Sequence, residues 1–398
     1  MELPAHDVKT PEVSIVIPAL NEEITIADFV QWCHEGLAKA GVTGEIVIVD
    51  SSTDRTAERA LAAGARVLHV PKRGLGRAYI DALPFVRAPW IIMGDADCTY
   101  DFREIAPFIE RFRAGDEYVM GSRWKGSIED GAMPPHHRYF GTPVTTWILN
   151  RLYASRFSDI HCGMRGITKA ALIRMQLQSQ SWEYASEMVL KSVHMRLKTS
   201  EVPVHFLKDR DGRVSHHKRE GWFSPFKAAW INLRAMFVFG SDFFAFKPGL
   251  LMAYVGALLV AATTVSSLKV GPIVLSLYWQ LGGAVTFNIG LMSVMVAALS
   301  MILFDYTGTQ RKRWLRVFPY NRTIAIAAVS GLAGIGLLVP LLATYLGHHY
   351  RLPDGSDLQA HLGITGFALI LASFILFVFT LLLHAAALAS RFAPQERT

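Results

Sequence analysis

The sequence predicts an α/β domain built on a parallel sheet, followed by a region of four membrane-spanning α-helices. In the first part of the chain, four short runs rich in β-branched residues each end in a cluster of polar residues. Short apolar runs of this kind are typical of strands that are buried on both faces of a parallel sheet. Beyond about Phe246 the sequence changes to long apolar stretches with very few charges. Stretches of roughly 20 apolar residues are long enough to cross a bilayer as helices.

Each of the four strand-like runs ends in polar residues. They are Val13–Ile17, Glu45–Val49, Arg66–Val70 and the run that leads from Trp90 to Asp95-Ala96-Asp97. Between them, Ile24–Ala40 and Thr53–Ala63 are long enough for the crossover helices that parallel strands require. In such sheets ligands bind beyond the carboxyl ends of the strands. Those ends carry carboxylates, Asn, Lys and Arg here, which suits a metal ion that bridges an anionic ligand.

Four apolar stretches predict the membrane spans. They cover about Pro248–Ser267, Val274–Leu303, Thr323–Leu346 and Leu362–Ser390. The alternative, a set of buried core helices, is disfavoured because the stretches are too long and too uncharged. The loop between the second and third spans carries a group of cations: Arg311, Lys312, Arg313, Arg316 and Arg322. The first loop has only Lys269 and the third only Arg351, so the positive-inside rule places the first domain and both termini in the cytoplasm.

Composition narrows the partners and the compartment. The chain has 398 residues and a formal net charge of +7, yet no nucleic-acid-binding module is visible. Anionic lipid and phosphate-bearing substrates explain the charge better. Cys33, Cys98 and Cys162 lack metal-ligand spacing and are expected to stay reduced in the cytoplasm. We expect an integral protein of a bacterial-type inner membrane, without a cleavable signal peptide because Met1–Thr10 is polar, and leave homo-oligomerisation open.

The predicted organisation has four parts. They are a soluble domain at residues 1–220, a juxtamembrane segment at 221–247, the membrane helices at 248–390 and a tail at 391–398. Apolar side chains recur at helical spacing in the juxtamembrane segment: Phe223, Phe226, Trp230, Leu233 and Phe237. This spacing predicts an amphipathic helix at the membrane interface, and the alternative is a helix packed inside the soluble domain.

Three groups of polar residues are candidates for a site. Asp95 and Asp97 offer the hard oxygen ligands that Mg²⁺ and Mn²⁺ prefer. Asp50 ends a strand, where its carboxylate suits a base or a ribose, whereas Asp54 or Thr53 suits the N-cap of the next helix. The segment Arg73–Arg77 suits a phosphate cradle or a plain turn. Glu183 and Glu187 lie one helical turn apart, facing either the site or solvent.

The joint pattern resembles the family 2 glycosyltransferases with the GT-A fold, a Rossmann-like, mostly parallel architecture. The resemblance covers roughly Pro11 to Ser215 and rests on several motifs. They are Ser14–Glu23, Val47–Asp54, Asp95-Ala96-Asp97, Gly121-Ser122-Arg123, Asp159–Arg165 and Glu201–Phe206. Within the family, the chain looks like the polyprenyl-phosphate sugar synthases, the group that includes dolichyl-phosphate mannose synthase. That group also contains bacterial relatives with trailing membrane helices.

The resemblance assigns roles to residues of this chain. It implies that a nucleotide sugar is bound by Pro18, Ala19, Asn21, Glu22, Asp50, Ser52, Lys72, Gly74, Asp95, Ala96 and Asp97. It implies that Asp95 and Asp97 hold Mg²⁺ or Mn²⁺. It places Arg123, Arg138, Arg210 and Ser215 at the phosphate of the lipid acceptor, with catalysis by Asp97 and the three arginines. Two departures concern Cys98-Thr99, where the family often has Leu-Gln, and His216, where it has Lys.

The implied reaction is the metal-dependent transfer of a hexose from a UDP-glucose or GDP-mannose type donor to polyprenyl phosphate, with inversion. An acceptor with a lipid hydroxyl, of the diacylglycerol or ceramide type, is the first alternative. A non-catalytic membrane scaffold or lipid-translocating protein is the second. Gln310–Trp314 also matches a Gln-x-x-Arg-Trp pattern of processive polysaccharide synthases. We disfavour that reading, because two spans intervene between this pattern and the soluble domain and the Glu-Asp pair of those enzymes is missing.

Overall fold

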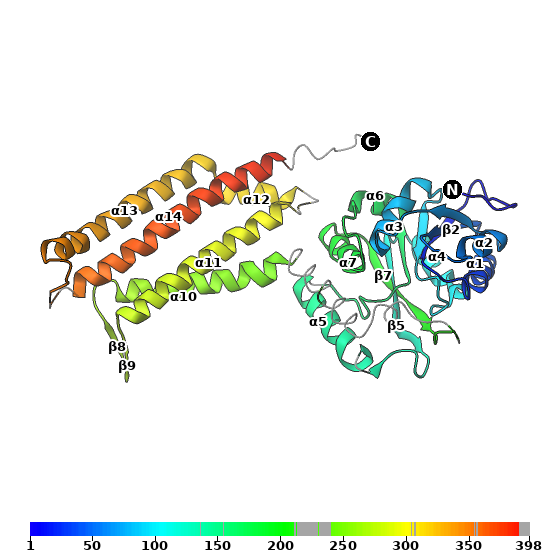
Figure 1. The fold of residues 1–398 in the computed structure, drawn as a ribbon, viewed down its shortest axis with the longest axis horizontal. Coiled ribbons are helices and arrows are strands. Elements are labelled where there is room, and N and C mark those ends of the chain that lie inside the picture. The colour runs from blue at the N-terminus through cyan, green and yellow to red at the C-terminus, as the bar shows by residue number, and fades with distance from the viewer. Residues whose placement is uncertain are drawn as a thin grey trace. The chain divides into compact units, whose positions relative to one another are not determined.

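The structure is a computed structural model of a chain that forms two compact units, Met1–Met236 and Phe237–Thr398 (Figure 1). It describes residues 1–135, 137–153, 155–210, 212, 230, 240–303, 305, 308–353, 355 and 357–389. The division after Met236 falls inside the juxtamembrane segment of residues 221–247. Most of that segment lies outside the described residues. Trp230, which is described, exposes 61% of its surface, and Asp242–Phe246 forms a π-helix.

A seven-stranded sheet, counted over the described residues, forms the centre of the first unit. Its strands are β1 (Val13–Ala19), β2 (Gly44–Asp50), β3 (Arg66–His69), β4 (Trp90–Met93), β5 (Tyr118–Ile128), β6 (Arg165–Thr168) and β7 (Thr199–Phe206). Their order across the sheet is β3-β2-β1-β4-β6-β5-β7. The first four strands pair in parallel, and β6 runs antiparallel to both of its neighbours. The predicted mostly parallel, Rossmann-like architecture is therefore confirmed.

Helices connect and cover the strands of this unit. They are α1 (Ile26–Ala40), α2 (Thr56–Ala62), α3 (Leu75–Ala82), α4 (Ala106–Arg113), α5 (Thr142–Tyr153), α6 (Lys169–Met175) and α7 (Tyr184–His194). Short helical turns lie at η1 (Leu83–Phe85), η2 (Phe102–Glu104) and η3 (His137–Gly141). The two predicted crossover helices are α1 and α2, so the parallel strands are connected as expected.

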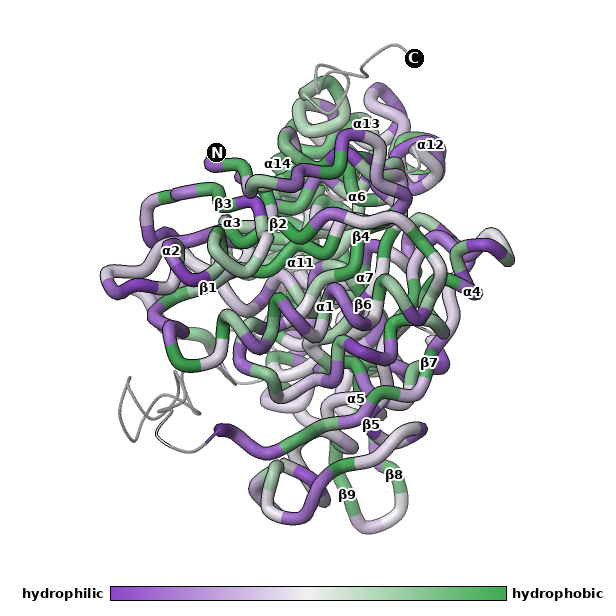
Figure 2. The backbone as a smooth tube through the Cα atoms, turned by 90° about the vertical axis from the view of Figure 1, so that its right-hand side faces the viewer, coloured by the Kyte–Doolittle hydropathy of each residue, from purple (hydrophilic) through white to green (hydrophobic). Residues whose placement is uncertain are grey.

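The sequence of α1 explains its position on the sheet. Its buried apolar residues recur at three- and four-residue spacing: Ile26, Phe29, Val30, Cys33 and Leu37. Full burial of one large apolar side chain contributes about 1.5–3 kcal/mol, so this face holds the helix against the strands. Figure 2 shows the matching alternation of hydrophobic and hydrophilic residues along the tube. The helix ends at Gly41, whose φ of 61° is easily adopted by glycine.

The start of α2 differs from its prediction in one detail. Its N-cap position is Arg55, not Thr53 or Asp54. Asp54 nevertheless accepts hydrogen bonds from the Thr56 backbone N–H at 3.0 Å and the Thr56 hydroxyl at 2.5 Å. Asp54 lies one residue before the N-cap, yet its carboxylate accepts a hydrogen bond from the first backbone N–H of α2.

The second unit contains four helices that are long and apolar enough to cross a membrane, counted over the described residues. They are α10 (Lys247–Thr263), α11 (Leu277–Leu303), α13 (Tyr320–Gly347) and α14 (Asp357–Ala389). A short helix, α12 (Thr309–Val317), connects α11 to α13, and a hairpin of β8 (Leu268–Val270) and β9 (Ile273–Leu275) connects α10 to α11. The hairpin corrects two predicted bounds. The first span ends at Thr263 rather than Ser267, and the second begins at Leu277 rather than Val274.

The long helices pack as neighbours in the order α10–α11–α14–α13. In two of these contacts, α10 with α11 and α13 with α14, the helix backbones approach closely. A Cβ atom on Gly256 of α10 would lie 2.3 Å from the backbone nitrogen of Phe287 on α11. A Cβ on Gly334 of α13 would lie 2.7 Å from the carbonyl oxygen of Gly366 on α14. Small residues at these crossings let the helices approach closely, as they do between helices in membranes.

Candidate active site

Three loops leave the carboxyl ends of β1, β2 and β4 and are tied together by hydrogen bonds. The backbone N–H of Asn21 donates to the Ser52 hydroxyl at 2.8 Å, and the Asn21 side-chain oxygen accepts from the Thr53 N–H at 2.9 Å. The Thr25 hydroxyl donates to the carbonyl of Ala96 at 3.0 Å. Asn21 has a φ of 57°, which asparagine tolerates better than most residues. The structure thus brings the predicted loops to one edge of the sheet.

Asp50 is the last residue of β2 and is almost fully buried, at 4% exposed. One carboxylate oxygen accepts from the Ser52 N–H at 3.2 Å. The other lies 3.5 Å from Nδ1 of His69 at the end of β3. Pro18 and Ala19 end the neighbouring strand β1, and Glu22 is buried with its N–H donating to the Thr56 hydroxyl at 2.9 Å. Hydrogen bonds within the protein hold the Asp50 carboxylate and the Glu22 backbone in place.

The loop after β4 carries Asp95 and Asp97, both half-buried. One oxygen of Asp97 accepts from the Thr99 N–H at 3.0 Å and from the Thr99 hydroxyl at 2.6 Å. Cys98, between them, has a φ of 59°. Thr99, one of the two departures from the family pattern noted in the sequence, orients the Asp97 carboxylate.

Asp95 lies against the backbone of Gly163, in the loop before β6. A Cβ atom on Gly163 would come within 2.4 Å of Oδ2 of Asp95, so the carboxylate occupies space that only glycine leaves open. Two carboxylates in a half-buried loop fit a hard divalent cation. In the described ranges no group of three or more His, Cys, Asp or Glu residues gathers around one point. Mg²⁺ commonly binds one or two carboxylates and completes its ligand set with substrate phosphates and water.

Buried tyrosines surround Asp95, and the sequence analysis did not identify them. The Tyr100 hydroxyl accepts from the Gly163 N–H at 2.9 Å, and the Tyr79 hydroxyl donates to the Gly94 carbonyl at 3.0 Å. The Tyr184 ring lies 5.0 Å from that of Tyr79. Burial raises the pKa of Tyr184 to about 12, although Arg165 opposes the shift, and it raises the pKa of Tyr79 and Tyr100 well above the ordinary value. The three phenols therefore stay neutral. Of the three tyrosines, only Tyr100 lies close in sequence to Asp95-Ala96-Asp97, so only Tyr100 could have been predicted to lie near Asp95.

The loop after β3 contains Lys72, whose side chain is exposed, and Gly74. Gly74 has a φ of 111°, and a Cβ there would lie 2.3 Å from the carbonyl oxygen of Gln180. The Arg77 N–H donates to that same carbonyl at 3.0 Å. The glycine is thus explained by a turn packed against the loop that precedes α7, the second of the two predicted readings.

Arg123, predicted to hold the acceptor phosphate, is instead bound by a buried carboxylate. Its Nε and one terminal nitrogen donate to the two oxygens of Asp159 at 2.6 and 2.8 Å. Arg123 is 8% exposed and Asp159 is fully buried. Burial opposes the charged form of Arg123, but Tyr100 and the hydrogen-bonded Asp159 outweigh it, so the pKa of Arg123 lies above its ordinary value. The pair holds the loop that begins at Asp159 and uses Nε and one terminal nitrogen of Arg123, so the role of Arg123 at the acceptor phosphate stays a prediction.

Arg138 and Arg210 lie in different surroundings. Arg138 borders an open pocket of about 560 Å³, together with Trp124, Tyr139, Pro143, Thr146, Trp147, Asn150 and Ser158. Arg210 lies 3.3 Å from Asp28 and over the ring of Trp32, both on α1. The joint role of these two arginines with Arg123 at the acceptor phosphate stays a prediction. Ser215 and His216 lie outside the described residues.

Glu187 was expected to face either the site or solvent, and it does neither. It is fully buried, accepts from the Ser179 N–H at 2.8 Å and pairs with Lys191 at 2.5 Å. Burial lowers the pKa of Lys191, while Glu187 opposes the shift. Glu187 is thus a structural residue that ties α7 to the preceding loop. Glu183 is half-buried at the N-cap of α7.

Comparison with known proteins places this site in a family. The family model described as "Glycosyl transferase family 2" matches residues 14–175. The low-salt glycan biosynthesis hexosyltransferase Agl6 of Haloferax volcanii is 35% identical over 74% of this chain and 70% of its own length. A dolichyl-phosphate hexose transferase of the same organism is 26% identical over 51% of this chain and 86% of its own.

Among solved structures, glucosyl-3-phosphoglycerate synthase from Mycobacterium tuberculosis, in complex with Mn²⁺, UDP and glucosyl-3-phosphoglycerate, aligns with a TM-score of 0.43. It is 20% identical, and the alignment covers 56% of this chain and 80% of that one.

Proposed function

The chain belongs to the family 2 glycosyltransferases and is a hexosyltransferase, and from this premise we propose that it transfers a hexose from a nucleotide sugar to a polyprenyl phosphate at a membrane surface. The observation that carries the proposal is the combination of two features in one chain. Asp50 ends β2, Asp95 and Asp97 lie in the loop after β4 at the same sheet edge, and four long apolar helices follow. A relative described as a dolichyl-phosphate hexose transferase supports the choice of a lipid phosphate acceptor.

The donor half of the site is preformed. In this proposal Asp50, the last residue of β2, accepts hydrogen bonds from a base or ribose, and the hydrogen bond between Asn21 and Ser52 ties the two neighbouring loops together. The leaving group of the reaction is a nucleoside diphosphate, whose negative charge increases as the glycosidic bond breaks. A divalent ion held by Asp95 and Asp97 would neutralise that charge. Thr99 keeps the Asp97 carboxylate turned to one orientation, which reduces the reorganisation needed during transfer.

The acceptor half needs no strong general base. A phosphate monoester is already anionic and nucleophilic, so its oxygen attacks the anomeric carbon directly as the diphosphate leaves. Such a direct displacement inverts the anomeric centre. Arg123, Arg138 and Arg210 are the arginines proposed for the acceptor phosphate, and the pair with Asp159 orients Arg123. Catalysis is then positioning plus electrostatic stabilisation.

The second unit is proposed to anchor the enzyme in the membrane. Four helices of the described residues are long and apolar enough to cross a bilayer. The basic helix α12 and the single cations of the other two loops favour a cytoplasmic site for the first unit. A cytoplasmic site also matches the location of nucleotide sugars.

The test is transfer of radiolabelled hexose by the purified full-length chain in detergent, with UDP- and GDP-sugars and short-chain polyprenyl phosphate. Each reaction is run with Mg²⁺, Mn²⁺ or EDTA. We expect an organic-extractable, metal-dependent product that mild acid hydrolyses, because a glycosyl phosphate is acid-labile. A product formed only on diacylglycerol or ceramide, stable to mild acid, would overturn the phosphate acceptor. Nucleotide binding without any transfer would favour a scaffold.

A further inference from the structure

The short helix α12 (Thr309–Val317) connects two long apolar helices and is strongly basic. Its nine residues include four cations and no acidic residue. The cations are Arg311, Lys312, Arg313 and Arg316. In the sequence these cations indicate only the orientation of the membrane helices. The Gln-x-x-Arg-Trp pattern that contains them has no function assigned to it.

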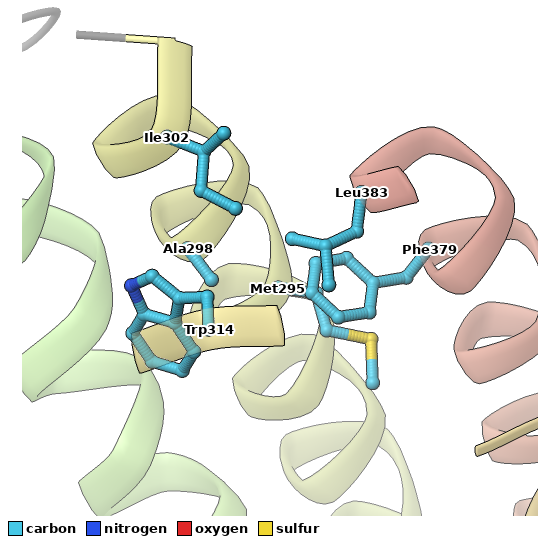
Figure 3. Close-up of a cluster of buried hydrophobic side chains, with 6 residues drawn as sticks. All are labelled: Met295, Ala298, Ile302, Trp314, Phe379 and Leu383. Atoms are coloured by element: carbon cyan, nitrogen blue, oxygen red, sulfur yellow. The ribbon is translucent and has the colours of Figure 1, made fainter. Parts of the chain in front are cut away.

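One face of α12 is anchored inside the helix bundle by Trp314. This residue is only 4% exposed and belongs to a cluster of buried side chains from α11 and α14, which Figure 3 shows. The other members are Met295, Ala298, Ile302, Phe379 and Leu383. Its ring also stacks on Phe318, with ring centres 6.0 Å apart. Trp314 is therefore buried among the helices of the second unit.

Anchoring one face turns the cations outward. Lys312, Arg313 and Arg316 are exposed, while Arg311 is half-buried. Within the described part of the chain, none of these three exposed cations forms an ion pair with a carboxylate. The Arg311 N–H donates to Asp305 at 2.7 Å, which holds the first turn of the helix. α12 therefore presents three exposed cations next to one another along a short helix.

We propose that this outward face of α12 is a docking surface for the anionic phosphodiester headgroups of the bilayer. The inference rests on the membrane placement of the second unit that the proposed function includes. α11 ends at Leu303 and α13 begins at Tyr320, so α12 lies between the ends of two spans. The five residues before α12 extend at most about 18 Å, which keeps the helix at the headgroup level. Charge complementarity selects anionic lipid over zwitterionic lipid.

The expected strength follows from the number of cations. Each Lys or Arg near an anionic membrane surface changes lipid affinity by about fivefold. Three such residues on one fixed face therefore change it by up to about a hundredfold. The contribution is electrostatic, so it must weaken at high salt, where the Debye length falls to about 3 Å at 1 M.

The test measures binding of fluorescent phosphatidylglycerol to the purified full-length chain in neutral detergent with phosphatidylcholine. No nucleotide sugar is present, so the result does not depend on the transfer reaction. The test variant is Lys312→Gln/Arg313→Gln/Arg316→Gln, which keeps Trp314 and the buried cluster. The matched control is Lys269→Gln/Arg351→Gln, which removes two exposed cations from the other loops.

We expect the triple variant to bind phosphatidylglycerol at least tenfold more weakly at low salt, the control to change less than twofold, and the difference to vanish near 1 M salt. Equal thermal midpoints of the wild type and the triple variant in phosphatidylcholine show that folding is intact. Unchanged phosphatidylglycerol binding in the triple variant, or a loss that salt does not affect, would overturn the proposal. Loss of polyprenyl phosphate binding with phosphatidylglycerol binding intact would also overturn it, since the surface would then belong to the substrate.

Discussion

Gly163 offers a sharp test of the carboxylate pair, because glycine is required there by space alone. An added Cβ would lie 2.4 Å from Oδ2 of Asp95 and 3.0 Å from a ring carbon of Tyr100. Ordinary contact begins near 3.4 Å, so the Asp95 carboxylate must retreat by about 1.0 Å (3.4 − 2.4). A misplacement of about 1 Å at a catalytic group costs about a hundredfold in rate, which corresponds to about 2.7 kcal/mol. Gly163→Ala should therefore lower kcat by about two orders of magnitude.

The assay compares kcat and the metal concentration for half-maximal activity in wild type and Gly163→Ala, together with thermal unfolding of both. Overpacking also lowers the free energy of unfolding by about 1–3 kcal/mol, so activity is measured well below the melting temperature. The matched control is Gly336→Ala on α13, where an added Cβ meets no atom within 4 Å. A Gly163→Ala enzyme with wild-type kcat and unchanged metal dependence would refute the placement of Asp95 in the site.

Three further predictions concern Thr99, Asp159 and Asp101. Thr99→Val removes the hydroxyl that donates to Asp97 at 2.6 Å and should lower kcat about tenfold with little change in donor KM, whereas Thr99→Ser should restore activity. Asp159→Asn leaves the buried Arg123 unpaired and should lower the free energy of unfolding by about 3–5 kcal/mol, measured by chemical denaturation; a loss below 1 kcal/mol would contradict the buried pair. Burial alone would raise the pKa of Asp101, but hydrogen bonds from Arg103 lower this pKa below the ordinary 3.8. The ionised carboxylate therefore stabilises the fold above that pH, and the contribution is lost as the pH falls through the lowered pKa. Melting temperatures should therefore decline more steeply below about pH 4 in wild type than in Asp101→Asn, and parallel declines would refute this.

The sequence predicted the parts of the fold whose signals are local. Strands β1 to β4 were visible because β-branched runs are buried on both faces, and α1 was visible from its apolar spacing. The loops holding Asn21 and Asp50 were expected to meet because parallel strands bring their carboxyl ends to one edge. These features need no knowledge of distant contacts.

The rest depends on pairings between distant segments. Arg123 and Asp159 are separated by 36 residues, and nothing in either motif shows that one neutralises the other. The antiparallel strand β6, inserted between β4 and β5, likewise follows from chain packing rather than from its own sequence. In the second unit, hydropathy alone extended the first predicted span past the end of α10 to Ser267 and began the second at Val274, which lies in the apolar strand β9.

The most direct test of the account couples nucleotide release to lipid glycosylation. Purified wild-type chain and Asp97→Ala are compared for nucleoside diphosphate released and labelled lipid formed, with and without polyprenyl phosphate, and circular dichroism verifies that the variant is folded. The account predicts one nucleoside diphosphate released per glycosylated lipid in wild type and neither product in Asp97→Ala. Wild-type turnover in Asp97→Ala, or nucleotide release that polyprenyl phosphate does not stimulate, would contradict it.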